Sequence, residues 1–204
     1  MCAVQISIFK DIEKYLVDQP RPLMGAETIQ ILLVREILDY TVLRTEESRE
    51  LNSVHTPLSE SKRQEVVKRV AFLGGKQKAA ESRQLESILR SAAKDVSLKD
   101  TKECFLKDNL CLECPRCALF GATALSDKAN IKHRIEYSTA FSLLTIDQIG
   151  DEITFNAVGE LDQKTGQALG SRHVVRPGSL FPSIVTLKCV TREELVLAVK
   201  TLLA

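Results

Sequence analysis

Apolar residues along this chain repeat with two different periods, which predicts a protein of mixed helix and strand. Residues 27–43 are rich in β-branched and apolar side chains and favour one long or bent strand. From Ser61 the pattern is typical of a helix, because Ser61 and Gln64 have capping-box spacing and valines follow at helical intervals. The pair Gly74 and Gly75 is expected to end this helix and form a loop.

Beyond the two glycines the apolar positions predict a second amphipathic helix. They recur at i, i+3, i+4 and i+7, at Leu85, Ile88, Leu89 and Ala92. Residues 184–190 predict a strand, and Thr191 and Glu194 have the spacing of a capping box that opens a last helix. One face of that helix carries Leu195, Ala198, Val199 and Leu202.

Between these helical segments the period shortens towards two. Residues 140–146 and 153–157 alternate well enough to be strands. The polar segment 159–176 has few apolar positions to pack and contains turn residues at 162–166, so it predicts an exposed β-hairpin or arm. The best candidate for an internal boundary is the charged, Cys-bearing stretch 94–110.

Composition places the chain among ordinary globular proteins. Its 204 residues are 44% hydrophobic and 27% charged, enough for one core with a small appended module, and this excludes intrinsic disorder. No apolar run reaches the roughly 18 residues of a membrane helix, and no charged-then-apolar leader opens the chain, so we expect a cytoplasmic protein without a membrane partner. The net charge of +1 gives no argument for nucleic acid.

The distribution of charge says more than its sum. Between Lys62 and Arg90 there are eight basic and three acidic residues, a net charge of 8 − 3 = +5. This charge surrounds the expected Gly74–Gly75 loop, where backbone and lysines could approach a phosphate chain. Smaller basic groups recur at Lys128, Lys132 and Arg134, and at Arg172, His173 and Arg176. A solvated helix face is the alternative for each group taken alone.

Four cysteines fall within fourteen residues, at Cys104, Cys111, Cys114 and Cys117. The C-x-x-C-x-x-C run can offer three thiolates on a tight turn stiffened by Pro115, with Cys104 as the fourth ligand. This set favours a tetrahedral Zn²⁺ ion. A closed four-sulfur shell leaves no position for water, which indicates a structural ion and argues against zinc-activated hydrolysis.

Other interpretations of the cysteines stay open. His133 could replace one thiolate, and a four-cysteine set also suits an iron–sulfur cluster. A redox dithiol or a disulfide is disfavoured, because no signal peptide is present and Cys2 and Cys189 stand apart from the cluster.

Catalysis finds little support in the sequence. The chain has no Gly-x-Ser-x-Gly elbow, P-loop or His-Glu-x-x-His helix. An acidic loop residue could serve RNA cleavage, and Asp39 and Asp127 are the two candidates for that role. Both are isolated, however, and an isolated aspartate is more often a solvated turn residue. We therefore predict that the chain is not an enzyme and has no catalytic residues.

Several motifs stand in an order that carries a family resemblance. The chain is similar, over roughly residues 20–204, to the backbone (RAMP superfamily) subunit of the type I-D CRISPR interference complex, or Cascade. The resemblance rests on Lys76-Gln-Lys78, the cysteine cluster running into Leu119-Phe-Gly121, Thr139-Ala-Phe-Ser142, Thr154-Phe-Asn-Ala157, His173-Val-Val-Arg-Pro177 and Phe181-Pro-Ser-Ile-Val-Thr-Leu187.

The resemblance implies an α+β fold, a modified ferredoxin-like or RRM-type palm over residues 1–204. It implies an inserted zinc-binding element at 95–135 and a β-hairpin thumb at 151–176. Copies of such a subunit line up along one guide RNA (crRNA) together with other Cascade subunits, and target nucleic acid pairs with the guide in antiviral defence. The family continues beyond the last helix with further strands, so a C-terminally shortened palm is expected here.

The resemblance also suggests which side chains contact RNA. Lys76 and Lys78, with Arg63 and Arg69, are assigned to guide phosphates, because flexible cations follow a backbone of any sequence. His173 and Arg176, at the base of the arm, are assigned to RNA or to a neighbouring subunit, with structural bonding around Pro177 as the alternative. Two other functions stay open: a metal-dependent RNase of the same superfamily, and a zinc-stabilised protein-interaction module.

Overall fold

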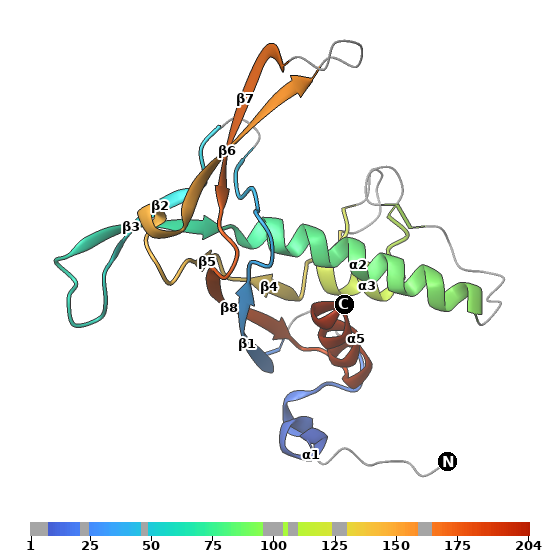
Figure 1. The fold of residues 1–204 in the computed structure, drawn as a ribbon. Helices are drawn as coiled ribbons and strands as arrows, with labels where there is room; N and C mark the ends of the chain where they lie inside the picture. Colours follow the sequence, from blue (N-terminus) through green and yellow to red (C-terminus); the bar gives the residue numbers. More distant parts are fainter. Residues whose placement is uncertain are drawn as a thin grey trace. The chain divides into compact units, whose positions relative to one another are not determined.

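The computed structural model describes residues 8–20, 25–45, 49–95, 104–105, 110–123, 130–158 and 165–204. It confirms the predicted α+β class (Figure 1). The elements, in chain order, are α1 (Ile8–Ile12), η1 (Glu13–Tyr15), β1 (Thr28–Glu36), β2 (Ser53–Pro57), β3 (Val66–Phe72), α2 (Gly74–Asp95), α3 (Pro115–Phe120), β4 (Ile135–Tyr137), β5 (Ala140–Phe141), α4 (Ile146–Ile149), β6 (Gly150–Val158), β7 (Thr165–Val175), β8 (Leu180–Lys188) and α5 (Arg192–Leu203).

The strands of the described residues form sheets with the orders β1-β8-β4, β2-β3-β5 and β6-β7. β4 and β8 are antiparallel, with Glu136 opposite Thr186. β6 and β7 form an antiparallel hairpin in which Gly150 lies opposite Val175, and the register shifts between Asn156 and Val158. β7 lies within the segment 159–176 expected for the arm, whereas its partner β6 contains the strand expected separately at 153–157. Most of the turn expected at 162–166 lies outside the described residues. The ferredoxin-like connectivity of the palm stays a prediction.

Contacts divide the chain into two compact units, each built from separate segments. The first unit comprises Met1–Ile31, Gly74–Tyr137 and Ile184–Ala204, and the second comprises Leu32–Leu73 and Ser138–Ser183. The core of the second unit is a cluster of buried apolar side chains in which Phe72 meets the ring of Phe181 edge-on, with the ring centroids 6.5 Å apart. Its buried members are Ile37, Leu43, Leu51, Val70, Ala140, Ile149, Val175 and Phe181.

In the first unit, α2 and α5 use the apolar faces that their sequences predict. Leu85 of α2 is fully buried and Ile88 and Leu89 are partly buried, whereas Ala92, which the sequence predicts on the same face, is exposed. Leu195 and Ala198 of α5 are buried, whereas Val199 lies at the margin and is exposed. The predicted capping box of α5 is confirmed, because the Thr191 side chain accepts from the Glu194 amide and the Glu194 side chain accepts from the Thr191 amide. This cap begins the helix at the residue that the sequence indicates.

The helix predicted from Ser61 to Gly74 is wrong. Val66–Phe72 forms the strand β3, whose exposed and buried positions alternate and whose Val70 pairs with Ser53 of β2. Runs of β-branched residues pack well on a pleated surface, and pairing with β2 and β5 decides between the two periods. The strand expected over 140–146 is also shorter than predicted, since it ends at Phe141 and α4 begins at Ile146.

Gly74 begins α2 and does not end a helix. A Cβ atom at Gly74 would lie 2.2 Å from the carbonyl oxygen of Tyr137, whereas a Cβ at Gly75 would meet nothing within 4 Å. The glycine therefore allows the first turn of α2 to lie directly against the end of β4. Tyr137 strengthens this contact, because its hydroxyl donates to the carboxylate of Glu81 on α2.

We expect Gly74→Ala to lower the free energy of unfolding by about 1–3 kcal/mol, the usual cost of overpacking, since the backbone of Tyr137 must move. Gly75→Ala is the matched control and should raise the free energy of unfolding by up to about 1 kcal/mol. Alanine restricts the unfolded chain more than glycine does, and its Cβ meets no neighbour in the folded protein. Urea unfolding of both variants measures the difference. Equal effects of the two substitutions would contradict the close contact.

Candidate metal centre and nucleic-acid interface

The C-x-x-C-x-x-C run folds into a tight turn that leads into α3. Cys114 is the N-cap of this helix, Pro115 is its first residue, and Cys117 lies buried in its first turn. Leu112 adopts a positive φ of 64° in the turn between the first two cysteines. Gly121 ends the helix with φ 85°, where a Cβ would come within 2.9 Å of the amide nitrogen of His133.

The fourth cysteine is positioned by α2. The guanidinium of Arg90 donates to the carbonyl of Cys104 over 3.1 Å and lies 4.8 Å from the ring centroid of Phe105. Arg90 is itself held on the helix by an ion pair with Glu86, one turn earlier. The long helix therefore anchors the segment that brings Cys104 to the other three cysteines.

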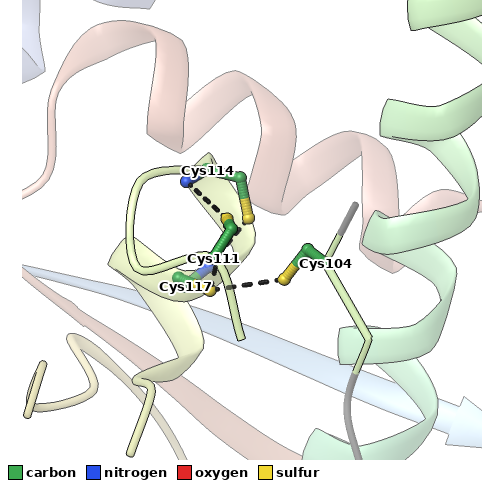
Figure 2. Close-up of side chains that lie close together, drawn as sticks. All are labelled: Cys104, Cys111, Cys114 and Cys117. Carbon is green, nitrogen blue, oxygen red and sulfur yellow. Dashed lines mark hydrogen bonds between the residues drawn. The ribbon is translucent and has the colours of Figure 1, made fainter. Parts of the chain in front are cut away.

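The four sulfur atoms form one compact group (Figure 2). All four lie within 4.8 Å of one another; the Sγ of Cys117 is 3.5 Å from that of Cys104 and 4.0 Å from that of Cys111. A disulfide requires an S–S distance of about 2.05 Å, which is much shorter than these separations. A tetrahedral zinc ion with Zn–S bonds of about 2.3 Å sets its sulfurs about 3.8 Å apart. The observed spacing therefore fits a tetrahedral metal ion.

Backbone amides of the turn point at two of the sulfurs. The amide of Cys114 donates to the Sγ of Cys111 over 3.3 Å, and the amide of Cys117 donates to the Sγ of Cys114 over 3.5 Å. Such donors stabilise thiolates, the form that binds metal.

The pKa values of the thiols in the cluster are shifted in different directions. Burial alone would raise the pKa of Cys111, but hydrogen bonds from the Glu113 and Cys114 amides and from neighbouring thiols outweigh it and hold the pKa at about 7. Burial raises the pKa of Cys114 and of Cys117, and the nearby Cys104 raises both further. The Cys111 thiol therefore ionises more readily than those of Cys114 and Cys117. A divalent cation among the four sulfurs would favour the thiolate form of each.

The other candidates for metal ligands lie elsewhere. His133 is outside the sulfur group, and its Nε2 lies 3.7 Å from Oε1 of Glu136. Cys189 is buried with its Sγ 3.5 Å from Oε2 of Glu27, and Cys2 is outside the described residues. The structure thus brings together the four cysteines that the sequence indicates and leaves out His133.

The lysines assigned to RNA lie in the first turns of α2, not on a loop. Lys76 is exposed and Lys78 is half-buried. Burial lowers the pKa of Lys78, the Glu136 carboxylate opposes this effect, and the Arg116 guanidinium adds to it. Arg116 is buried and donates from Nε to the hydroxyl of Ser82 over 3.0 Å.

Arg69 and Arg63 have different environments in the second unit. The half-buried guanidinium of Arg69 donates to the Thr56 hydroxyl over 3.0 Å and to the carbonyls of Leu58, Ser142 and Leu143, so it joins β2 and β3 to the segment after β5. Arg63 is exposed and forms an ion pair with Glu60 in the turn between the strands. Arg69 therefore has a structural role, whereas the guanidinium of Arg63 lies at the surface.

His173 and Arg176 lie at the base of the β6–β7 hairpin. The Nε of Arg176 is 3.0 Å from Oδ2 of Asp151, and its amide donates to the carbonyl of Ile149 over 2.9 Å. These contacts of Arg176 agree with the alternative to RNA binding, in which it forms structural bonds around Pro177. His173 is exposed and lines a cavity of about 450 Å³ whose other walls include carboxylates of the second unit. The acidic lining residues are Glu50, Asp147, Asp151 and Glu152.

The six basic residues predicted to bind RNA belong to different units. Lys76 and Lys78 lie in the first unit, and Arg63, Arg69, His173 and Arg176 lie in the second.

Among the helices of the described residues, none combines the length and the apolar character that a membrane span needs.

Comparison with protein families gives a match to the Csc2 CRISPR family over residues 15–204. The chain belongs to the Csc2 family. Among solved structures, it is similar to Csc2 from Thermofilum pendens, with a TM-score of 0.64 and 25% sequence identity over 94% of this chain and 65% of that one. It is also similar to a chain of a type IV-B CRISPR complex, with a TM-score of 0.57 and 11% identity over 85% of this chain and 79% of that one. Comparison with curated protein sequences gives no match.

Membership of the Csc2 family confirms that the resemblance noted in the sequence is to CRISPR proteins. This Csc2-family chain spans 65% of the length of the Thermofilum pendens protein. The likeness to the type IV-B chain supports the fold alone, because only 11% of residues are identical.

Sequence reasoning on this Csc2-family chain missed two residues whose charges act on the pKa of Lys78. Glu136 lies on β4, a strand of three residues that is too short for its alternation to be recognised. Arg116 follows Pro115 inside the cysteine turn, where the cysteines dominate the pattern. A signal for Glu136 does exist, because the basic run Lys132, His133 and Arg134 stands two to four residues before it.

Proposed function

We propose that this chain is a non-catalytic crRNA-binding backbone subunit of a type I-D CRISPR surveillance complex. The match to the Csc2 CRISPR family over residues 15–204 carries the proposal. The likeness to the Thermofilum pendens Csc2 structure over 94% of the chain supports the same conclusion. The subunit holds the guide through its phosphates, works in the cytoplasm, and leaves sequence reading to base pairing with the target.

The cysteine cluster holds a structural zinc ion in this proposal. Four sulfurs within 4.8 Å of one another supply a complete tetrahedral shell, and Cys117 is buried at the start of α3. Bound zinc fixes the cysteine turn and the Cys104 segment that α2 anchors. A four-cysteine iron–sulfur cluster is the alternative occupant.

Lys76 and Lys78 bind guide phosphates. Both lie in the first turns of a helix of 22 residues, whose amino-terminal end favours negative charge. The exposed ammonium of Lys76 can follow a backbone of any base sequence. Copies of the chain and other Cascade subunits share the same guide, and the β6–β7 hairpin acts as the thumb that crosses it.

We expect the double variant Lys76→Ala and Lys78→Ala to weaken RNA binding by a similar factor for different sequences. The negative slope of log affinity against log salt should become shallower by about 0.7 for each lost phosphate contact. Fluorescence anisotropy with two unrelated single-stranded RNAs measures both quantities. Lys200→Ala, at an exposed position of α5 in the same unit, is the matched control and should leave both unchanged. A loss confined to one sequence would contradict contact with the backbone.

A further inference from the structure

Basic side chains of the first unit gather around a single carboxylate, that of Glu136 on β4. The Nζ of Lys188 lies 2.7 Å from Oε1 of Glu136, and the Nε2 of His133 lies 3.7 Å from the same oxygen. The charges of Lys78 and Lys132 also act on this group: Lys78 interacts with Glu136 and His133, and Lys132 interacts with both as well. We call Lys78, Lys132, His133 and Lys188 the β4 basic cluster.

Three separate segments of the fold supply the β4 basic cluster. The close contact of Gly74 with Tyr137 lays the start of α2, which carries Lys78, against the end of β4, which carries Glu136, and the charge of Glu136 acts on Lys78. Lys132 and His133 lie on the segment that enters β4, next to the α3 cap. Lys188 ends β8, and its amide donates to the carbonyl of Arg134 over 2.9 Å. The grouping is therefore a product of the tertiary structure.

Positive charge exceeds negative charge within this group. At neutral pH the three lysines and Glu136 sum to 3 − 1 = +2, with His133 uncharged. Burial lowers the pKa of His133, and the positive charge of Lys78 lowers it further. The hydrogen bond from Lys188 lowers the pKa of Glu136, which keeps that carboxylate ionised.

The group is also accessible to a ligand. The side chains of His133, Glu136 and Lys188 are 41%, 40% and 33% exposed, and Lys132 is exposed. A phosphodiester carries one negative charge on two oxygens, as a carboxylate does, and it is attracted by clustered cations whatever its base sequence. Glu136 therefore occupies the position that a phosphate would favour.

We propose that the β4 basic cluster is a second phosphate site for RNA, in which Glu136 holds the cations in the free protein and competes with the incoming phosphodiester. The site continues the path of the RNA from Lys76 across β4 to the end of β8. Glu136 then limits affinity, which favours guides that engage several sites at once. This inference rests on the proposed RNA-binding function and adds Lys132, His133 and Lys188 to it.

The test measures binding of the full chain to a labelled, unstructured single-stranded RNA over a range of salt concentrations. Glu136→Gln keeps the size of the side chain and removes its charge, so it should tighten binding about twofold to fivefold, the range that a surface ion pair implies. Lys132→Gln should weaken binding and make the salt slope shallower by about 0.7. Lys200→Gln on α5 is the matched control and should change neither quantity.

Melting temperatures of the same variants separate binding from folding. A purely structural Lys188–Glu136 pair predicts that Glu136→Gln lowers the melting temperature and leaves RNA affinity equal or weaker. That result overturns the proposal, as does unchanged RNA binding by Lys132→Gln. If the wild-type chain binds RNA in either case, the proposed function survives while the second site fails. If the wild-type chain binds no RNA, both fail together.

Discussion

Replacing Cys117 with serine is expected to release the metal ion and to unfold the cysteine turn with α3. Cys117 is fully buried, and its sulfur lies 3.5 Å from that of Cys104 and 4.0 Å from that of Cys111, so it is the most enclosed member of the sulfur group. Structural zinc sites in small peptides supply about 10–16 kcal/mol of binding free energy. The loss should therefore lower the melting temperature more than any other single substitution proposed for this chain.

Metal analysis and thermal unfolding of Cys117→Ser test this expectation. Wild-type protein should hold about one zinc ion and the variant almost none. Cys189→Ser is the matched control, because Cys189 is also buried but lies outside the sulfur group, and it should keep the metal. Full metal content in Cys117→Ser would contradict a four-cysteine site, and iron in place of zinc would favour the iron–sulfur alternative.

The second large effect is expected at Arg134, whose guanidinium is buried beneath α5. It donates to the carbonyls of Ala118 and Cys189 over 3.2 and 2.8 Å and forms two hydrogen bonds with the carboxylate of Glu194. Glu194 also accepts from the Thr191 amide as part of the α5 cap. One ion pair thus joins α3, the end of β8 and the start of α5.

Arg134→Met should lower the free energy of unfolding by about 3–5 kcal/mol, because it leaves the buried carboxylate of Glu194 without its cation. For a chain of this size, the melting temperature should fall by roughly 6–20 °C. Lys62→Gln breaks an exposed ion pair with Glu65 and is the control, with an expected loss below about 1 kcal/mol.

Adding Glu194→Leu to Arg134→Met should restore part of the lost stability, since an apolar pair replaces an uncompensated buried charge. The recovery should stay incomplete, because leucine cannot accept from the Thr191 amide and that half of the α5 capping box is lost. Chemical denaturation of the two single variants and the double variant measures this coupling. Additive losses in the double variant would contradict the assignment of the cost to an uncompensated charge.

Local signals in the sequence were sufficient for part of the fold and of the candidate site. The spacing of Cys111, Cys114 and Cys117 is fixed within one turn, so geometry follows directly from sequence. The capping box at Thr191 and Glu194 and the polar arm before Pro177 are local in the same sense. The cysteines and the capping-box residues are three positions apart in the chain, and the hairpin pairs two consecutive strands.

The remaining features depend on contacts between distant segments. Valines after Ser61 fit either period, and pairing of Val70 with Ser53 decides for a strand. Gly74 carries the usual sequence signal of a helix end, and the contact with the Tyr137 carbonyl shows the opposite role. Arg69 looked like a surface cation, yet its partners Thr56 and Ser142 come from other segments of the second unit.

The central proposal is that this Csc2-family chain binds the sugar-phosphate backbone of a guide RNA. The most direct test is binding of the purified, metal-analysed protein to a labelled CRISPR guide and to an unrelated single-stranded RNA, each titrated against salt. We predict binding to both RNAs, with affinity that falls steeply as salt rises. Folded protein that holds its metal ion and binds neither RNA would contradict the claim and favour a zinc-stabilised protein-interaction module.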